Sequence, residues 1–227
     1  MRKIFEIINQ NLSRLQFFKN KRSQSSVLPV ITISREKRAG GRTIAYMVAK
    51  KLVRPWKVYD KEIIDEIAEK EKLEKKLIEE IDEKRLSAVD QLINDFFGKR
   101  YLSLTRYYKS LVKVISEIAH RGYAIIVGRG ADYLIPHALK IRILGDMEHR
   151  INIAMKYDKL SRQKAIEFLK KCDEERDEFI KNLYHHDPKK AHHYDLVIKT
   201  GPNLSLEDAT DLIVRLAKKK IQIIAPI

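Results

Sequence analysis

The stretch VITISREKRAGGRTIAYMVAKKL, residues 30–52, joins an apolar run to a helical pattern through a short glycine turn. Backbone N–H groups and the helix dipole stabilise an anion at a helix N-terminus. Gly40 and Gly41 lack Cβ atoms, so they can adopt positive φ and let the backbone approach a phosphate closely. This layout predicts a strand, a phosphate-binding turn and a helix. From spacing alone, a plain glycine turn with solvated arginines explains the pattern equally well.

The usual phosphate-loop signature, G-x-x-x-x-G-K-[ST], is missing here because Gly41 stands at the expected lysine position. Arg42 and Thr43 follow it, shifted by one residue from the lysine and hydroxyl of that signature. An arginine can bridge phosphate oxygens bidentately, and a threonine hydroxyl can reach a magnesium ion. We therefore treat both side chains as candidates for nucleotide binding.

Five apolar runs read as buried strands, and helical patterns separate them. The expected strands lie within residues 27–34, 56–60, 124–128, 140–144 and 195–199. The expected helices cover residues 41–52, about 61–120, 147–156, 162–184 and 206–219. Helices between apolar strands imply an α/β protein with a mainly parallel sheet covered on both faces. Such sheets bind ligands at the carboxyl ends of their strands, so the sites to inspect follow Ile33, Tyr59 and Val127.

The chain also shows a domain organisation. Residues 61–120 carry no strand signal and are too long for a simple crossover, so we expect a helical subdomain inserted between the second and third strands. Residues 1–26 form an amphipathic helical extension and linker, which docks on the domain, binds a partner or lies on a membrane surface. The main domain then covers residues 27–220, with a C-terminal tail at 221–227.

Charge and composition narrow the functional classes. The net charge is +15, and residues 1–60 hold 14 Lys or Arg against 3 Asp or Glu, so this end favours a nucleotide, nucleic acid or acidic lipid. No helix-turn-helix, RNP or zinc-finger pattern supports nucleic-acid binding. The single cysteine, Cys172, excludes an intrachain disulfide, which fits a reducing cytoplasm. No apolar run approaches the ~20 residues that span a bilayer. Nothing in these patterns specifies an oligomeric state.

At three further places the residues allow both a functional and a purely structural interpretation. Arg129, between two glycines after the third strand, is either a clamp for a second phosphate or an exposed arginine on a turn. Asp60, after the second strand, either contacts a substrate or caps the next helix. Asp173 and Arg176 lie three apart on one helix face, which is either solvated or able to close over transferring phosphates.

Four histidines, His185, His186, His192 and His193, gather near the end of the chain. Adjacent histidines point in different directions, and neither a cysteine nor an H-E-x-x-H motif accompanies them. We expect a flexible polar loop here and not a zinc site.

Five motifs in order resemble those of the cytidylate kinase-like proteins, relatives of the P-loop nucleoside monophosphate kinases. The motifs are ITISRE with GGR and IA (31–36, 40–45), YDKEII (59–64), AIIVGRGADYLI (124–135), DEER (173–176) and HHYDLVIKT (192–200). The resemblance implies a P-loop NTPase-type three-layer fold with a five-stranded parallel sheet. It also implies that the helical region at 61–120 binds the nucleoside monophosphate and that a lid covers residues 157–192.

The implied reaction transfers the γ-phosphoryl group of ATP, with Mg²⁺, to a nucleoside monophosphate, of which CMP or dCMP is the leading choice. Carried over by position, the donor phosphates would lie on Gly40, Gly41, Arg42 and Thr43, with Thr43 toward the metal ion. The acceptor would lie beside Asp60 and Arg129, the lid would supply Arg176 and Arg162, and the donor base or phosphates would lie near Arg150. A nucleotide-binding regulatory protein without turnover and a kinase of another small substrate stay open as alternatives.

The chain departs from the family pattern in the loop itself. Relatives read SREFGSGGRE where residues 34–43 read SREKRAGGRT, so Lys37 and Arg38 replace an aromatic residue and a glycine. Because Arg38 cannot adopt positive φ as cheaply as glycine, we expect a loop of another shape or a weaker affinity for phosphate. Lys199 stands where relatives often carry Asn.

Overall fold

The computed structural model describes residues 28–52, 55–62, 64 and 106–224. The chain divides into two compact units, each of which is described by itself. One unit comprises residues 29–61 and 123–227, and the other comprises residues 1–28 and 62–122.

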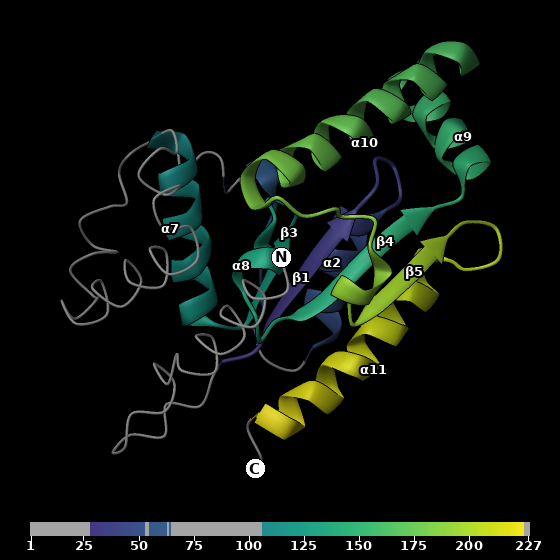
Figure 1. Cartoon of the computed structure of the whole chain (residues 1–227). Helices are drawn as coiled ribbons and strands as arrows, with labels where there is room; N and C mark the ends of the chain where they lie inside the picture. Colours follow the sequence, from purple (N-terminus) through teal and green to yellow (C-terminus); the bar gives the residue numbers. More distant parts are fainter. Residues whose placement is uncertain (1–27, 53–54, 63, 65–105, 225–227) are drawn as a thin grey trace, which may run out of the picture. The chain divides into compact units, whose positions relative to one another are not determined.

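The first unit contains a five-stranded sheet in the order β2-β3-β1-β4-β5 (Figure 1). Its strands are β1 (Val30–Arg35), β2 (Lys57–Tyr59), β3 (Ala124–Val127), β4 (Leu139–Gly145) and β5 (Leu196–Thr200). Every pairing is parallel, and β1 lies between β3 and β4. The predicted α/β fold with a five-stranded parallel sheet is therefore confirmed. The carboxyl ends of β1 and β3 meet at one edge, so the segments that follow these strands are neighbours.

The helices of this unit follow the predicted pattern closely. They are α2 (Gly41–Lys51), α8 (Ala131–Leu134), α9 (Met147–Asp158), α10 (Arg162–Tyr184), the 3₁₀ helix η2 (Ala191–His193) and α11 (Leu206–Ile224). The predicted helix over residues 162–184 is confirmed, whereas α11 continues beyond the predicted end. The sequence did not indicate α8, because four residues are too short to show a helical period.

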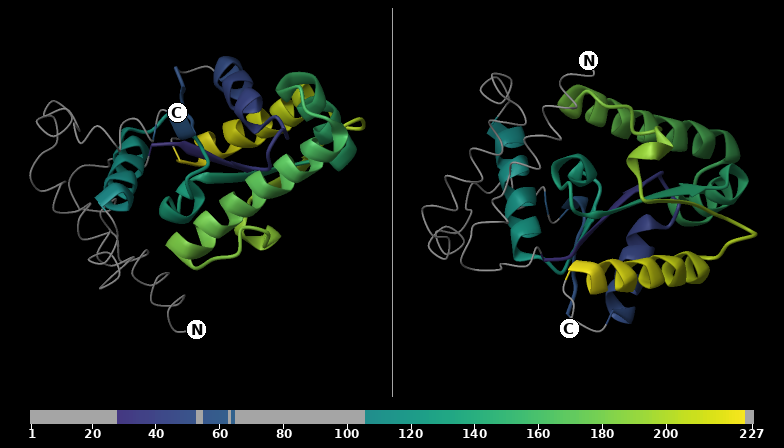
Figure 2. Two further views of the ribbon diagram at one scale, coloured as in Figure 1. Left: turned by 90° about the horizontal axis from the view of Figure 1, so that it is seen from above. Right: turned by 60° about the horizontal axis from the view of Figure 1, so that its bottom comes forward.

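The two faces of the sheet differ in chemistry. Residues Ile33 and Ile141 belong to an aliphatic core with Ile44 of α2 and Ile213 of α11. Figure 2 shows α2 and α11 on this side of the sheet and α10 on the other. Because side chains alternate along a strand, the neighbouring positions of β1 and β4 face α10. They include polar residues, such as Ser34 and Arg142, although a parallel sheet is usually apolar on both faces.

Lys199, the departure on β5, lies at the start of α9. Its Nζ is 3.6 Å from Oδ2 of Asp146, which is the N-cap residue of that helix. The Asp146 carboxylate also accepts the N–H of His149, and this bond holds the pKa of Asp146 below its usual value, with a smaller contribution from Lys199. The lysine therefore helps to fix the point where α9 begins.

In the second unit, the structure describes α7 (Arg106–Arg121). Its apolar residues Leu111, Ile115 and Ile118 recur at helical spacing and are buried. The rest of the predicted inserted subdomain, over residues 65–105, and the N-terminal extension lie outside the described residues. Among the residues that the structure describes, no helix combines the length and the apolar character that crossing a bilayer requires.

Candidate active site

The loop between β1 and α2 has the backbone of an anion site. Gly40 is the N-cap residue of α2 with φ +81°, and it brings no side chain to the first N–H groups of the helix. The first turn holds no acidic residue. A Cβ atom on Gly41 would lie only 2.8 Å from Cβ of Arg35, so this close approach requires glycine. These N–H groups, with the helix dipole behind them, fit the phosphates of a nucleotide.

Arg42 and Asp60 come together at the edge of the sheet. Nη2 of Arg42 lies 2.8 Å from Oδ2 of Asp60, and Oη of Tyr46 donates to the same oxygen at 3.5 Å. The carboxylate is 2% exposed, while the Arg42 side chain is 59% exposed. Thr43, in the same turn as Arg42, is also exposed, so its hydroxyl is accessible to a bound metal ion.

Arg38 adopts the left-handed conformation, with φ +61°, which is unexpected for a residue other than glycine. A non-glycine residue there costs ~1–2 kcal/mol. Its guanidinium binds Asp158 at the end of α9 through both Oδ atoms, with 2.9 Å between Nε and Oδ2. This bidentate pair offsets the backbone cost, so Arg38 adopts a positive φ that glycine would take more cheaply, and the expected weaker affinity for phosphate stays a prediction.

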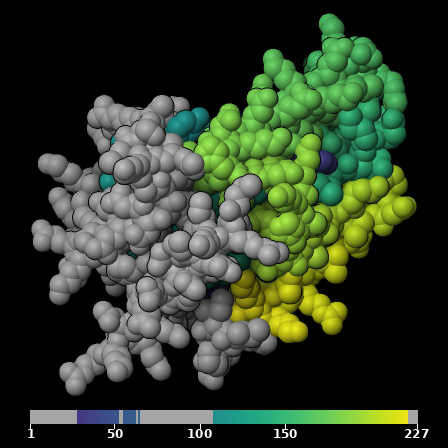
Figure 3. All heavy atoms as spheres, in the orientation of Figure 1, coloured from purple at the N-terminus to yellow at the C-terminus, as the bar shows by residue number. Residues whose placement is uncertain are grey.

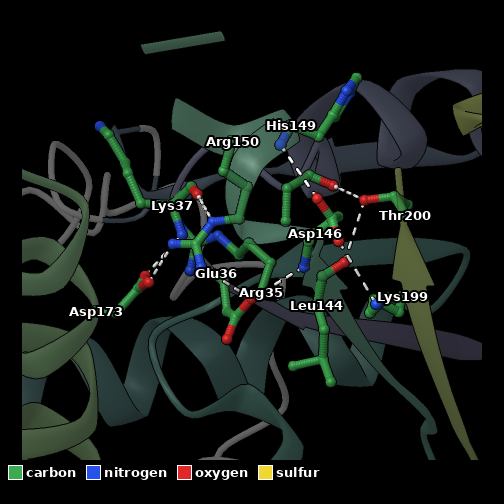
Figure 4. Close-up of polar contacts among 12 residues, drawn as sticks. Arg35, Glu36, Lys37, Leu144, Asp146, His149, Arg150, Asp173, Lys199 and Thr200 are labelled. Atoms are coloured by element: carbon green, nitrogen blue, oxygen red, sulfur yellow. Dashed lines mark hydrogen bonds and ion pairs between the residues drawn. The ribbon is translucent and has the colours of Figure 1, made fainter. Parts of the chain in front are cut away.

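Arg150 of α9 holds the same loop from the other side (Figure 4). It is 4% exposed. Its Nε donates to the carbonyl oxygen of Lys37 at 2.7 Å, Nη1 donates to Oε2 of Glu36 at 3.1 Å, and Nη2 donates to Asp173. The N–H of Gly145 donates to the same Glu36 oxygen at 2.9 Å. The Arg150 guanidinium, which we expected near the donor nucleotide, thus binds the loop and α10 in this structure.

The two predicted lid arginines occupy different places. Nη1 of Arg176 lies 3.4 Å from the carbonyl oxygen of Arg35 and 3.4 Å from Oδ1 of Asp173. Burial lowers the pKa of Arg176, and the nearby Asp173 opposes that shift. Arg162 instead pairs with Glu148 of α9 at 2.8 Å, and both side chains are exposed. The structure therefore brings Arg176, but not Arg162, to the loop.

The turn after β3 consists of three consecutive left-handed residues, Gly128, Arg129 and Gly130, with φ of +81°, +60° and +69°. A Cβ atom on Gly128 would overlap the guanidinium of Arg35, so the glycine lets the end of β1 pack on this turn. Arg129 lies 5.1 Å from the Phe179 ring of α10, and its carbonyl oxygen accepts the Tyr184 hydroxyl at 2.9 Å. The predicted acceptor arginine thus lies where β3, β1 and α10 meet.

Arg142 is a buried cation on the polar face of the sheet, with 7% of its surface exposed. Its Nη1 donates to Ser34 Oγ at 3.0 Å and to the Tyr194 hydroxyl at 3.5 Å. Burial raises the pKa of the Tyr194 phenol, so the acceptor stays neutral at physiological pH. Arg142 therefore holds the side chain of Ser34, the first residue of the SRE motif, on the polar face of the sheet.

The segment with the four histidines is a loop ending in η2, but two of the rings are packed and not free. His186 and His193 both stack on Tyr133, with ring centroids 5.0 and 4.0 Å away. His193 Nε2 also lies 3.1 Å from Oδ2 of the buried Asp132. Burial lowers the pKa of His186, which favours the neutral ring in the stack. These two side chains are thus packed against Tyr133, and the flexibility expected of the loop stays a prediction.

Sequence reasoning missed several residues that hold the site together. They are Arg35, Glu36, Arg142 and Asp158. Arg35 and Glu36 lie within the quoted SRE motif, so their place between strand and glycine turn was a usable signal. Asp158 is 120 residues from its partner Arg38, and no local pattern connects the two.

The sequence profile of the cytidylate kinase-like family matches residues 30–202, which include the loop, the GRG turn, α9 and α10. No significant match appears among curated proteins.

Several solved structures resemble the fold. An uncharacterized protein from Eubacterium ventriosum has a TM-score of 0.66 and 22% identity, with 84% of this chain and 98% of that chain covered. A protein from Thermus thermophilus has a TM-score of 0.47 and 15% identity, with 83% and 97% covered. The dephospho-CoA kinase from Campylobacter jejuni has a TM-score of 0.40 and 19% identity, with 84% and 97% covered. At 22% identity, the similarity to the Eubacterium ventriosum protein shows a shared fold and nothing about function.

Proposed function

The chain belongs to the cytidylate kinase-like family, and we propose that it transfers the γ-phosphoryl group of ATP to a nucleoside monophosphate, with CMP or dCMP as the leading acceptor. Family membership supports a kinase. The observation that carries the proposal is the glycine turn at the carboxyl end of β1, with the uncapped first turn of α2 behind it.

The donor nucleotide binds on this turn. The N–H groups of Gly40 and Gly41 contact its phosphates, and the exposed Arg42 guanidinium supplies the charge that lysine supplies in the usual loop. Thr43 would hold Mg²⁺ through its hydroxyl, and the ion would supply positive charge that neutralises the phosphates. The first turn of α2 suits the nucleotide phosphates, because it offers backbone N–H groups and the Arg42 guanidinium without an acid. The Thr43 hydroxyl is the oxygen that this turn offers to the metal ion.

The acceptor binds between Asp60 and Arg129, the two candidates that follow β2 and β3. Arg129 binds its phosphate, and Asp60 holds Arg42 between donor and acceptor. Arg176 reaches the transferred group from α10, while Arg150 shapes the loop and lies near the donor phosphates. Arg162 is the weaker candidate for a contact from the lid, and it would have to leave Glu148 to reach the transferred group. Phosphoryl transfer needs little more than in-line placement and surrounding cations.

The test is a phosphoryl-transfer assay with purified protein, Mg²⁺ and ATP against a panel of nucleoside monophosphates. We expect ADP and the matching diphosphate from at least one acceptor, with the cytidine nucleotides fastest, and no product after chelation of Mg²⁺. If ATP raises the melting temperature but no acceptor reacts, the chain is a nucleotide-binding protein without turnover.

A specific observation favours including hydroxyl acceptors in the same panel. Asp60 is a buried carboxylate at the carboxyl end of β2, and a carboxylate in that place can accept the proton of a substrate hydroxyl. A small-molecule alcohol that reacts while every monophosphate fails would identify a kinase of another small substrate.

A further inference from the structure

Asp173 of α10 has an unusual set of partners for a carboxylate on a helix face. Its Oδ1 accepts the backbone N–H of Lys37 in the phosphate loop at 2.7 Å. Its Oδ2 accepts Nη2 of Arg150, and Arg176 lies 3.4 Å from Oδ1. The side chain is 23% exposed, although it lies on a charged segment of a long helix.

These three donors form the kind of site that binds a phosphoryl group. A loop N–H and two guanidiniums surround one anion, and charge-assisted bonds of this kind are the common way to bind phosphate. The donors come from three separate elements, the β1–α2 loop, α9 and α10, so the site exists only in this arrangement of the lid helices. In Figure 3 the atoms of α9 and α10, in green, adjoin one another on the viewed face.

We propose that the Asp173 carboxylate occupies the position of a nucleotide phosphate, and that a phosphoryl group must displace it from the Lys37 N–H, Arg150 and Arg176 to bind. The inference rests on the proposed nucleotide binding but not on turnover. An internal anion that fills the site lowers the fraction of binding-competent protein, and the apparent affinity falls by that fraction. Asp173 therefore keeps the lid closed on a loop without nucleotide.

A second ion pair between loop and lid allows the inference to be tested cleanly. Asp158 also joins the loop to α9, but among the residues that the structure describes it does so through the Arg38 side chain alone. Removal of the Asp158 charge weakens the link between the loop and α9 but leaves the hydrogen bond from the Lys37 N–H to Asp173 in place. On the same helix as Asp173, Glu174 is exposed and provides a charge-matched control.

The experiment is calorimetric titration of the full chain with inorganic pyrophosphate at low ionic strength. We expect Asp173→Asn to bind pyrophosphate at least about tenfold more tightly than the unmodified chain, since the competent fraction rises. Glu174→Gln and Asp158→Asn should change the affinity by no more than about threefold. An equal or weaker affinity in Asp173→Asn overturns the inference, as does an equal gain in Asp158→Asn or no binding by any variant.

A second measurement on the unmodified chain keeps the test valid if Asp173→Asn does not fold. Saturating pyrophosphate should keep the Lys37 amide protected from hydrogen exchange and speed exchange along α10, because the helix loses its anchor. Unchanged exchange on α10 would count against displacement. A tighter-binding Asp173→Asn that transfers phosphate to no acceptor leaves this inference intact and defeats the proposed kinase activity.

Discussion

Arg42 of α2 and Asp60 after β2 form an ion pair, with 2.8 Å between Nη2 and Oδ2. The pair joins two residues that the resemblance assigned to different substrates, one to the donor and one to the acceptor. Because the Asp60 carboxylate is buried and the Arg42 side chain is 59% exposed, Asp60 orients Arg42 toward whatever binds at the edge of the sheet. In the proposed reaction, this pair keeps a cation between the two nucleotides.

The first prediction concerns the two arginines proposed to contact phosphates. Arg42→Ala and Arg176→Ala should each lower kcat/KM by about 100-fold or more, because each removes a cation from the transferred group. Steady-state kinetics with the best acceptor measure the effect. Arg215→Ala, at an exposed position of α11, is the control and should retain full activity. Near-normal rates in both site variants would remove these residues from the proposed mechanism.

Arg129 should behave differently from the donor-side residues. Arg129→Ala should raise KM for the acceptor by about tenfold or more and leave KM for ATP nearly unchanged, since one phosphate contact is lost. Varying each substrate separately distinguishes these effects. Because Arg129 also packs on Phe179, a melting curve of the variant must accompany the kinetics. A larger effect on ATP than on the acceptor would contradict the assignment.

The strained loop residue gives a prediction about stability. Arg38→Ala loses the Asp158 pair but keeps a non-glycine residue at positive φ, so it should lower the free energy of unfolding by about 1–3 kcal/mol. Arg38→Gly loses the same pair but relieves the backbone, and should recover ~1 kcal/mol of that loss. Urea denaturation of the three proteins measures the difference. If the alanine and glycine variants are equally stable, positive φ at this position carries no cost.

Acid should destabilise the chain through His137. Burial, with Lys220 and Lys140 nearby, lowers the pKa of this histidine to about 4. The unfolded chain, with an ordinary histidine pKa near ~6.5, then binds more protons than the folded chain between the two values. Stability therefore falls as the pH drops through this window, by no more than about 3–4 kcal/mol from this group.

Unfolding free energies measured between these two pH values test that prediction. His137→Gln should flatten the pH dependence, whereas His192→Gln, at an exposed position, should leave it unchanged. The lowered pKa of His186 has the same sign, so some pH dependence should persist in the His137 variant. An unaltered slope in His137→Gln would show that another group is responsible.

Local pattern was enough to predict most of the sheet and its helices. The helix at Arg162–Tyr184 is an example of a helical pattern that the structure confirms, and Ser161 caps its start by accepting the N–H of Lys164. The five apolar runs predicted strands because they are short, apolar and separated from one another by helical patterns. Both signals lie within a few residues of the element that they describe.

The organisation of the site could not be predicted in the same way. Asp173 looked like part of a solvated helix face, yet it binds the Lys37 N–H from 136 residues away. Arg38 looked incompatible with positive φ, and only the position of Asp158 in space explains why the loop keeps that conformation. In both cases the conformation depends on a partner more than 100 residues away, and no local sequence pattern indicates that partner.

The separation of these contacts along the chain affects how the protein is made. Arg150 and Arg176 reach the loop across 113 and 141 residues, so a ribosome releases the glycine turn long before the helices that hold it. Contacts of such high sequence separation form late in folding, because their loop-closure entropy must be met first. A nascent chain that ends before α10 therefore carries a complete β1 and an unsupported loop. The ability to bind a nucleotide should arise near the end of synthesis, and truncation before residue 176 should abolish it.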